Sequence, residues 1–184
     1  ESLSATLNVD LDDIRWSQAS LPIRWGGLGV RGVVLLAPSA YLALASSTME
    51  LTSTLLPARL RDIKDSGVDA ALAAWTSQAA NPIEVSTPSP PASTVQRVWG
   101  DHCCKIQHVK HLNATSDPVD RARLLASCSQ GSGDWLHALP LSSVGLKLDN
   151  ATVRISAGLR LGAPVVRPHA CACGEMVTAD GHHG

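Results

Sequence analysis

Apolar and polar residues follow a helical period along most of this chain, and little of it alternates with the two-residue period of strands. The most apolar stretch is VVLLAPSAYLALASS, from Val33 to Ser47. Because Pro38 and Ser39 interrupt it, it is too short for a membrane span. We predict instead a buried helix from Ala40 to about Leu55, opened by Ser39. The residues that recur near helical spacing in it are Tyr41, Leu44, Ala45 and Leu55.

Four further helices are predicted. The Ala-rich DAALAAWTSQ places one around Val68 to Ser77, and a second runs from Val95 to Leu112. Ser116-Asp117-Pro118, a capping side chain followed by proline, starts a third that ends near Cys128. Asp149 or Asn150 caps a fourth, Ala151 to about Leu161. The fold class is therefore mainly α.

A proline-rich segment, NPIEVSTPSPPAST, separates the helix predicted around Val68 to Ser77 from the helix predicted from Val95 to Leu112. It spans residues 81–94 and places four prolines among serine and threonine, which is typical of an extended linker. We therefore expect two small helical lobes, residues 1–80 and 95–167, joined by this linker. Residues 168–184 form a short irregular tail.

Composition limits the kind of protein that the chain can be. Of its 184 residues 45% are hydrophobic and 17% charged, so it can bury a core. Five Trp, one Tyr and no Phe mean that Leu, Val and Ala must build most of that core. The net charge of −1 lacks the basic excess of a dedicated nucleic-acid-binding domain. Any nucleic-acid contact must come from local patches or from a larger parent chain.

The cysteines and the N-terminal sequence indicate where in the cell the protein is located. The five cysteines are odd in number, and the N-terminal ESLSATLNVDLDD lacks the basic start and apolar run of a signal peptide. We expect an intracellular protein, in cytoplasm and nucleus, with reduced thiols and no membrane contact. A first residue other than methionine, Glu1, suggests a fragment or a processed product.

The C-terminal PHACACGEMVTADGHHG is the strongest candidate for chemistry. Cys171 and Cys173 are followed, nine residues later, by His182 and His183, and cysteine and histidine are the usual ligands of zinc. Gly174 would allow the sharp turn that brings both thiolates to one ion, and Gly181 would bend the chain so that a histidine returns. The alternative interpretation is a flexible tail with reactive thiols.

Other candidate sites have simpler explanations. The stretch Gly26-Gly27-Leu28-Gly29 lacks the Gly-Lys-Ser/Thr ending of a phosphate loop, and we interpret it as a turn that lets Trp25 and Leu28 pack. Asp12-Asp13 resembles a metal-binding acid pair but is more typical of a solvated helix start near an unanchored N-terminus.

For two larger groups of side chains, the sequence does not decide between a functional and a structural role. The first would be a metal cluster on one helix, or an ordinary, partly exposed helix with chance thiols; its members are His102, Cys103, Cys104, His108 and His111. The second would be a phosphate-facing stripe, or ordinary surface arginines; its members are Arg121, Arg123, Arg154, Arg160 and Arg167.

Three blocks of the sequence together resemble one family. They are SLPIRWGGLGVRGVVLLAPSAYLALASS from Ser20, DRARLLASCSQGSGDWLHALPLSSVGLKLDN from Asp120, and VRISAGLRLGAPVVRPHACACG from Val153. In this order they are similar to the region behind the polymerase palm of non-LTR retrotransposon reverse transcriptases, which are RNA-directed DNA polymerases. The resemblance implies a thumb-like region over residues 1–80, a helical connector over 95–167 and a truncated zinc knuckle over 168–184.

The resemblance also implies a ligand set and a role. The knuckle motif, Cys-x-Cys-Gly and then His-Gly-Leu-Ser-Cys, matches Cys171, Cys173 and His183, the histidine that precedes Gly184; His182 falls one position early. The fourth ligand, a cysteine, would lie beyond Gly184, with His169 or His182 as a substitute. The implied cofactor is zinc, and the implied partners are element RNA or target DNA bound by the parent polyprotein.

We expect no enzymatic activity from this segment, because it contains no polymerase motif, no palm Asp-Asp turn and no nuclease motif. The leading hypothesis is a non-catalytic transposable-element fragment that positions nucleic acid beside the polymerase. One alternative is an exapted, stand-alone helical protein-interaction module. Another is a small metalloenzyme with an open zinc position and Glu175 or Asp180 as base.

Overall fold

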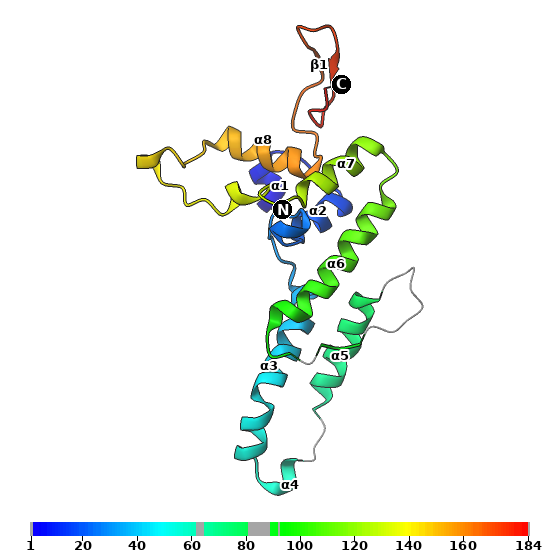
Figure 1. Cartoon of the computed structure of the whole chain (residues 1–184), viewed down its shortest axis with the longest axis vertical. Helices are drawn as coiled ribbons and strands as arrows, with labels where there is room; N and C mark the ends of the chain where they lie inside the picture. The colour runs from blue at the N-terminus through cyan, green and yellow to red at the C-terminus, as the bar shows by residue number, and fades with distance from the viewer. Residues whose placement is uncertain (1, 62–64, 81–88, 92, 184) are drawn as a thin grey trace. The chain divides into compact units, whose positions relative to one another are not determined.

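The computed structural model describes residues 2–61, 65–80, 89–91 and 93–183 (Figure 1). It is mainly helical, which confirms the predicted fold class. The described residues form two compact units by their contacts. The central unit is Arg31–Val109, and the split unit combines the chain up to Val30 with the chain from Lys110 onward.

The boundaries of these two units differ from those of the two predicted lobes, residues 1–80 and 95–167. The reason is that residues from both ends of the chain share one core. Of the predicted linker, residues 81–88 and 92 lie outside the described part of the chain. The linker, thumb-like and connector assignments therefore stay predictions.

The central unit contains α3 (Val33–Leu55), α4 (Ala58–Arg61), α5 (Ser66–Ala79) and the larger part of α6 (Gln96–Ala114). Helices α3 and α5 pack side by side (Figure 1). Two tryptophans dominate the core: the Trp75 and Trp99 rings meet edge to face with centroids 5.3 Å apart, and Trp75 Nε1 donates to Trp99 O at 3.1 Å. The other buried members of this core are Leu42, Ala43, Ala79 and Cys103.

Helix α3 corrects the prediction for this stretch in two ways. It begins at Val33 instead of Ala40, so it runs through Pro38 and Ser39, and it is exposed along most of its length. Its buried residues are Pro38, Ser39, Leu42 and Ala43. Of the residues predicted to recur in a buried helix, Leu44 and Leu55 are 58% and 72% exposed. Helical spacing identified the helix, but the fit of small side chains and Leu42 against α5 selects the inner face.

Continuation of α3 through Pro38 has a specific cause. Proline has no N–H, so Val34 O loses the hydrogen bond that residue 38 would normally donate. Gln78 Nε2, from α5, donates to Val34 O at 3.1 Å instead. Helix α3 has 23 residues and reaches a mean hydropathy of 1.3 over an 18-residue window, so by length and composition it is a candidate membrane span, which the shorter predicted helix was not.

The split unit packs four helices around a small core. These are α1 (Ser2–Leu7), α2 (Asp13–Ser20), α7 (Pro118–Ser127) and α8 (Asn150–Leu161), and α8 contacts the other three. Buried Leu7, Ala19 and Leu161 belong to its core. The N-terminal segment is thus anchored, contrary to expectation, because Leu7 is only 2% exposed. Asp12 caps α2 by accepting from the Arg15 N–H at 2.8 Å, as predicted for a helix start.

Short elements complete the split unit. They are the 3-10 turns η1 (Ile23–Trp25), η2 (Asp134–Leu136) and η3 (Ser142–Val144) and the antiparallel strands β1 (His169–Ala170) and β2 (Met176–Val177). The predicted glycine turn follows η1: Gly26 adopts φ +79°, and Leu28 packs against the core. A β-carbon on Gly27 would lie 1.9 Å from Leu21 O, so only glycine fits there.

Candidate metal centre

A short hairpin at the end of the split unit carries the candidate metal ligands. Strands β1 and β2 pair His169 with Val177 and Ala170 with Met176, and Val177 also bridges to His183. The turn between the strands closes through two hydrogen bonds, from the Cys171 N–H to Glu175 O at 2.8 Å and from the Gly174 N–H to Cys171 O at 2.9 Å. The hairpin therefore places residues 171–173 opposite the returning chain at His183.

Two glycines give the hairpin its bends, as the sequence predicts. Gly174 has φ +97° and Gly181 has φ +80°, values that side chains disfavour. A β-carbon on Gly181 would also lie 2.6 Å from Leu159 Cδ2, so this turn rests directly on α8. The bend at Gly181 brings the chain back toward the cysteines.

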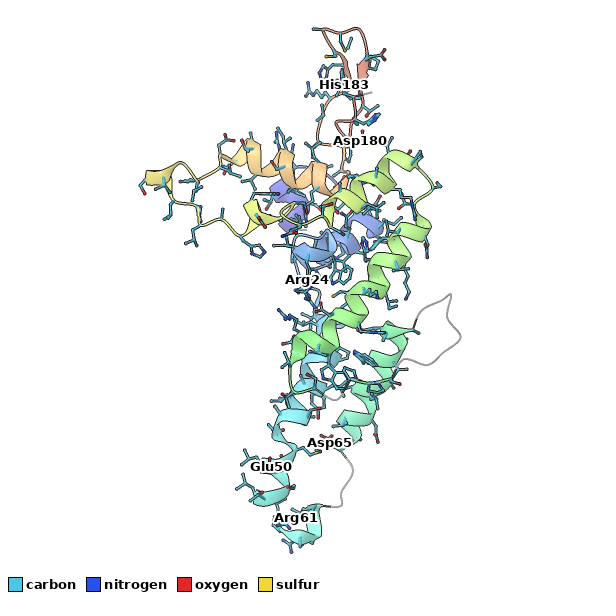
Figure 2. All side chains as sticks on the ribbon, in the orientation of Figure 1. Arg24, Glu50, Arg61, Asp65, Asp180 and His183 are labelled. Atoms are coloured by element: carbon cyan, nitrogen blue, oxygen red, sulfur yellow. The ribbon has the colours of Figure 1, made fainter. Side chains whose placement is uncertain are left out.

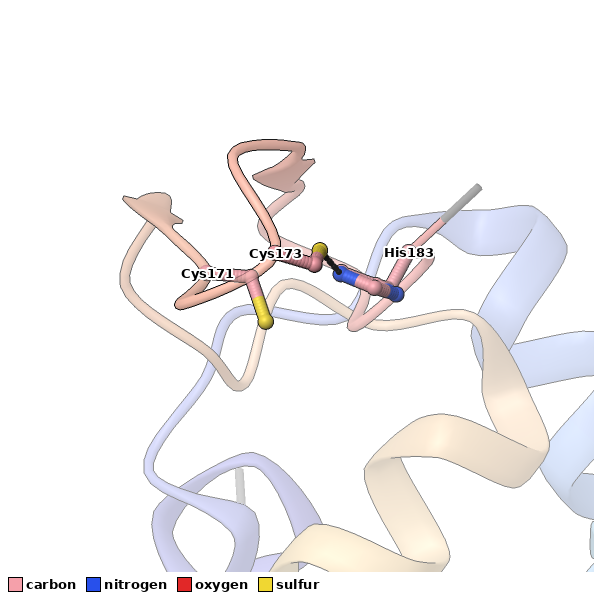
Figure 3. A group of neighbouring side chains, drawn as sticks. All are labelled: Cys171, Cys173 and His183. Atoms are coloured by element: carbon pink, nitrogen blue, oxygen red, sulfur yellow. Dashed lines mark hydrogen bonds between the residues drawn. The ribbon is translucent and has the colours of Figure 1, made fainter.

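Cys171, Cys173 and His183 come together at this hairpin (Figure 3). One ligand atom from each lies within 4.8 Å of the other two, and Cys173 Sγ is 3.1 Å from His183 Nε2. In a tetrahedral site with Zn–S near 2.3 Å and Zn–N near 2.0–2.1 Å, neighbouring ligand atoms stand about 3.5–3.8 Å apart. The group could hold a metal ion.

The chemistry of the sulfur atoms suits a cation. The backbone N–H of Cys173, and then its thiol, interact with the Cys171 sulfur and lower the pKa of the Cys171 thiol below its usual value. The thiolate is the form of cysteine that binds metals. Cys173 is exposed and Cys171 partly so, which leaves the sulfurs open to solvent.

His169 and His182, the suggested substitutes for a fourth ligand, are not in the group that the described residues form. His169 Nδ1 lies 2.9 Å from Arg167 O instead. The turn before His183 depends on residues that the sequence did not single out. Thr178 Oγ1 binds the Asp180 carboxylate and donates to His182 O at 3.1 Å. The hydroxyl of Thr178 is the main cause of a lowered pKa at Asp180. A Thr-x-Asp pattern ahead of the histidines is the signal that could have indicated this turn.

The second cysteine and histidine group is part of the packing of α6. Cys103, Cys104, His108 and His111 are all less than 9% exposed, and the described residues form no metal-binding group there. His102 lies against Trp75 with ring centroids 5.7 Å apart, and His111 Nε2 is 3.2 Å from Ser17 Oγ. Burial lowers the pKa of His108. A structural role explains these residues. The four buried ones are less exposed than the partly exposed helix that we expected from the sequence.

Of the five arginines left open between a phosphate-facing stripe and ordinary surface positions, Arg160 fits neither role, because it is buried. Arg160 is 8% exposed and donates to four backbone carbonyls: those of Ile23, Gly27, Ser127 and Ser132, at 2.7–3.1 Å. It cannot face a phosphate, because its guanidinium is directed into the protein. Arg123 binds Asp120 and the Arg160 carbonyl, and Arg121 donates to Leu112 O. Arg167 is exposed and Arg154 partly exposed (Figure 2 shows all described side chains).

Comparisons of this chain with family models, with curated proteins and with solved structures find no match.

Proposed function

We propose that the C-terminal hairpin binds zinc through Cys171, Cys173 and His183. The observation that carries this proposal is the convergence of these three ligand atoms within 4.8 Å on a hairpin whose bends require Gly174 and Gly181. Two thiolates and one imidazole form a donor set that zinc prefers over the hard cations calcium and magnesium. The fourth tetrahedral position then falls to a ligand from elsewhere or to water.

We further propose that the chain is a non-catalytic part of a reverse transcriptase polyprotein of the non-LTR retrotransposon type. Its role would be to position nucleic acid next to the polymerase. Support comes from the ordered resemblance of the three sequence blocks and from the metal-ligand triad at the position where that resemblance implies a zinc knuckle. Small zinc knuckles commonly recognise single-stranded nucleic acid, and Arg167 is exposed directly before the hairpin.

The proposed contact with nucleic acid is weak in the isolated chain. The net charge is −1, and of the five arginines considered for a phosphate stripe Arg160 is buried while Arg121 and Arg123 bind backbone carbonyls. Few phosphate contacts remain, so both affinity and its salt dependence are low.

Cobalt substitution tests the metal site. Thiolate ligation gives Co²⁺ an intense sulfur-to-metal charge-transfer band, and we expect this band at one Co²⁺ per chain, displaced by Zn²⁺. His183→Ala should weaken binding at least about tenfold, because it removes one of three protein ligands. His182→Ala is the matched control and should bind as the wild type does. Equal losses in the two variants, or no band with the wild type, would refute the site.

A separate titration tests the role. Fluorescence anisotropy with a labelled single-stranded RNA and a matching DNA, at about 50 mM salt, should give dissociation constants weaker than about 1 µM and a shallow salt slope. Removal of zinc with EDTA should weaken binding further. Sub-micromolar, steeply salt-dependent binding would contradict the weak contact, and no binding of either strand at about 100 µM protein would overturn the positioning role.

A further inference from the structure

The cysteines of this chain differ in how far solvent reaches them. Cys173 is exposed, and Cys171, in the same turn between β1 and β2, is partly exposed. Cys103 and Cys104 are buried in α6, each only 8% exposed. Cys128, at the end of α7, is partly buried, and burial raises the pKa of its thiol. Oxidants react with accessible thiols that ionise readily, so we expect an oxidant to reach the turn at residues 171–173 first.

The turn holds Cys171 and Cys173 at a separation that a disulfide can bridge. Because the Gly174 N–H donates to Cys171 O at 2.9 Å, residues 171–174 form a closed turn whose end Cα atoms are less than about 7 Å apart. Disulfides join residues whose Cα atoms are about 4.4–6.8 Å apart, a range that residues within such a bend can meet. The two sulfurs lie within 4.8 Å of each other, and the Cys173 thiol interacts with the Cys171 sulfur. The sulfurs are therefore neighbours on the turn.

We propose that Cys171 and Cys173 form a redox switch, in which a hydroperoxide converts the two thiols to a disulfide and the hairpin releases its metal ion. The release rests on the proposed zinc site, whereas the disulfide does not, because it forms in the metal-free chain as well. Metals bind the thiolate form of cysteine, and neither sulfur of a disulfide is a thiolate. Of the three ligands in the group, only His183 then remains (Figure 3).

The reaction is a two-electron oxidation of the thiol pair. The sulfur of Cys173, the more exposed residue, attacks one oxygen of hydrogen peroxide, the O–O bond breaks, and a water leaves behind a sulfenic acid. The Cys171 sulfur then attacks the Cys173 sulfur, the S–O bond breaks, and a second water leaves with the proton of the Cys171 thiol. Two thiols and one peroxide thus give one disulfide and two waters. With the metal bound as dithiolate, both protons come from solvent and the ion leaves as a free cation.

Mass spectrometry of the full, metal-free chain tests the disulfide. After one equivalent of hydrogen peroxide and alkylation of the remaining thiols, the C-terminal peptide should be lighter by two hydrogen atoms and carry no alkyl group at residues 171 and 173. A phosphine reductant should reverse this change, because exposed disulfides are easily reduced. Cys128→Ser is the matched control and should form the same disulfide. Oxidation of Cys128 before the pair, disulfides between chains, or sulfinic acids at residues 171 and 173 would each overturn the proposal.

The cobalt band distinguishes failure of the switch from failure of the zinc site. The reduced protein should bind Co²⁺, and the oxidised protein should bind it at least about a hundredfold more weakly, because two of the three protein ligands are lost. Binding should recover after reduction with the phosphine. An oxidised protein that carries the disulfide and keeps the band would overturn the switch and leave the metal site intact. A reduced protein without the band would refute the zinc site and the release of the metal, while the mass of the C-terminal peptide still decides whether the disulfide forms.

Discussion

The interior of the central unit and the interior of the split unit are stabilised by different kinds of interaction. In the central unit an apolar centre dominates, with Trp75 fully buried against Trp99 and the aliphatic side chains around them. In the split unit a buried cation, Arg160, joins the turn at residues 23–27, the end of α7 and the loop at Ser132 through backbone carbonyls. The comparison shows how a chain without phenylalanine orders segments that are far apart in sequence: by one large aromatic contact in one unit, and by one multivalent donor in the other.

The largest expected effect is on the apolar centre. Trp75→Ala should lower the free energy of unfolding by about 3–5 kcal/mol, because it empties a fully buried site and removes the edge-to-face contact. Urea denaturation measures this loss. Trp16→Ala, at a tryptophan of the split unit that is 40% exposed, is the control and should cost much less. Similar losses in the two variants would mean that Trp75 is not the centre of its unit.

Arg160→Met should cost about 3 kcal/mol, because four buried carbonyls lose a charged donor that an apolar side chain cannot replace. Hydrogen exchange should show faster opening at residues 23–27 and at the end of α7, with α5 unaffected. Arg154→Met, on the same helix and only partly buried, is the matched control. Unchanged stability of Arg160→Met would break the comparison, since the split unit would then also depend mainly on apolar packing.

Gln78→Leu should destabilise the central unit by about 1 kcal/mol, because Val34 O loses its donor. In a Pro38→Ala background the same change should cost almost nothing, since the restored N–H of residue 38 can bond to Val34 O. A double-mutant cycle from thermal unfolding measures the coupling. Additive effects would show that the amide of Gln78 does not replace the missing bond.

The smallest effect is a pH dependence in the central unit. Burial lowers the pKa of His108 below its usual 6.5 in the folded state, so between the two values the unfolded chain binds more protons. The stabilisation due to neutral His108 is complete above pH 6.5 and declines as the pH falls through the folded pKa. His108→Gln should flatten this slope in denaturation measured at several pH values. An unchanged slope would assign the effect to other groups.

The sequence predicted local structure well and long-range structure poorly. Caps and helix formers placed α5, α6, α7 and α8 within a few residues of their observed ends, because those signals act over single turns. The start of α3 was missed because Pro38 normally ends a helix, and the compensating Gln78 lies 40 positions away. No local signal distinguishes an arginine that binds four distant carbonyls from one on the surface, so Arg160 was misassigned.

The sequence named Cys171 and Cys173 from their spacing and His183 from the family resemblance, and the structure brings these three residues together as a group that could hold a metal ion. The Cys-x-Cys-Gly turn and the bend at Gly181 are local features of residues 171–183, and α8 supports the second of them through Leu159. The contribution of Thr178 and Asp180 was missed, because a hydroxyl and a carboxylate two residues apart are common in any sequence. The zinc assignment and the role in nucleic-acid positioning stay predictions.

The close approach of Gly181 to Leu159 has a consequence for the energetics of metal binding. In many small metal-binding motifs the ion must organise the chain, so its affinity is reduced by the entropy of ordering that chain. Here the turn at Gly181 packs on Leu159 of α8, so part of the order of the hairpin comes from packing and not from the ion. Enlarging the side chain at residue 181 should therefore lower metal affinity as effectively as altering a ligand, although residue 181 never touches the ion.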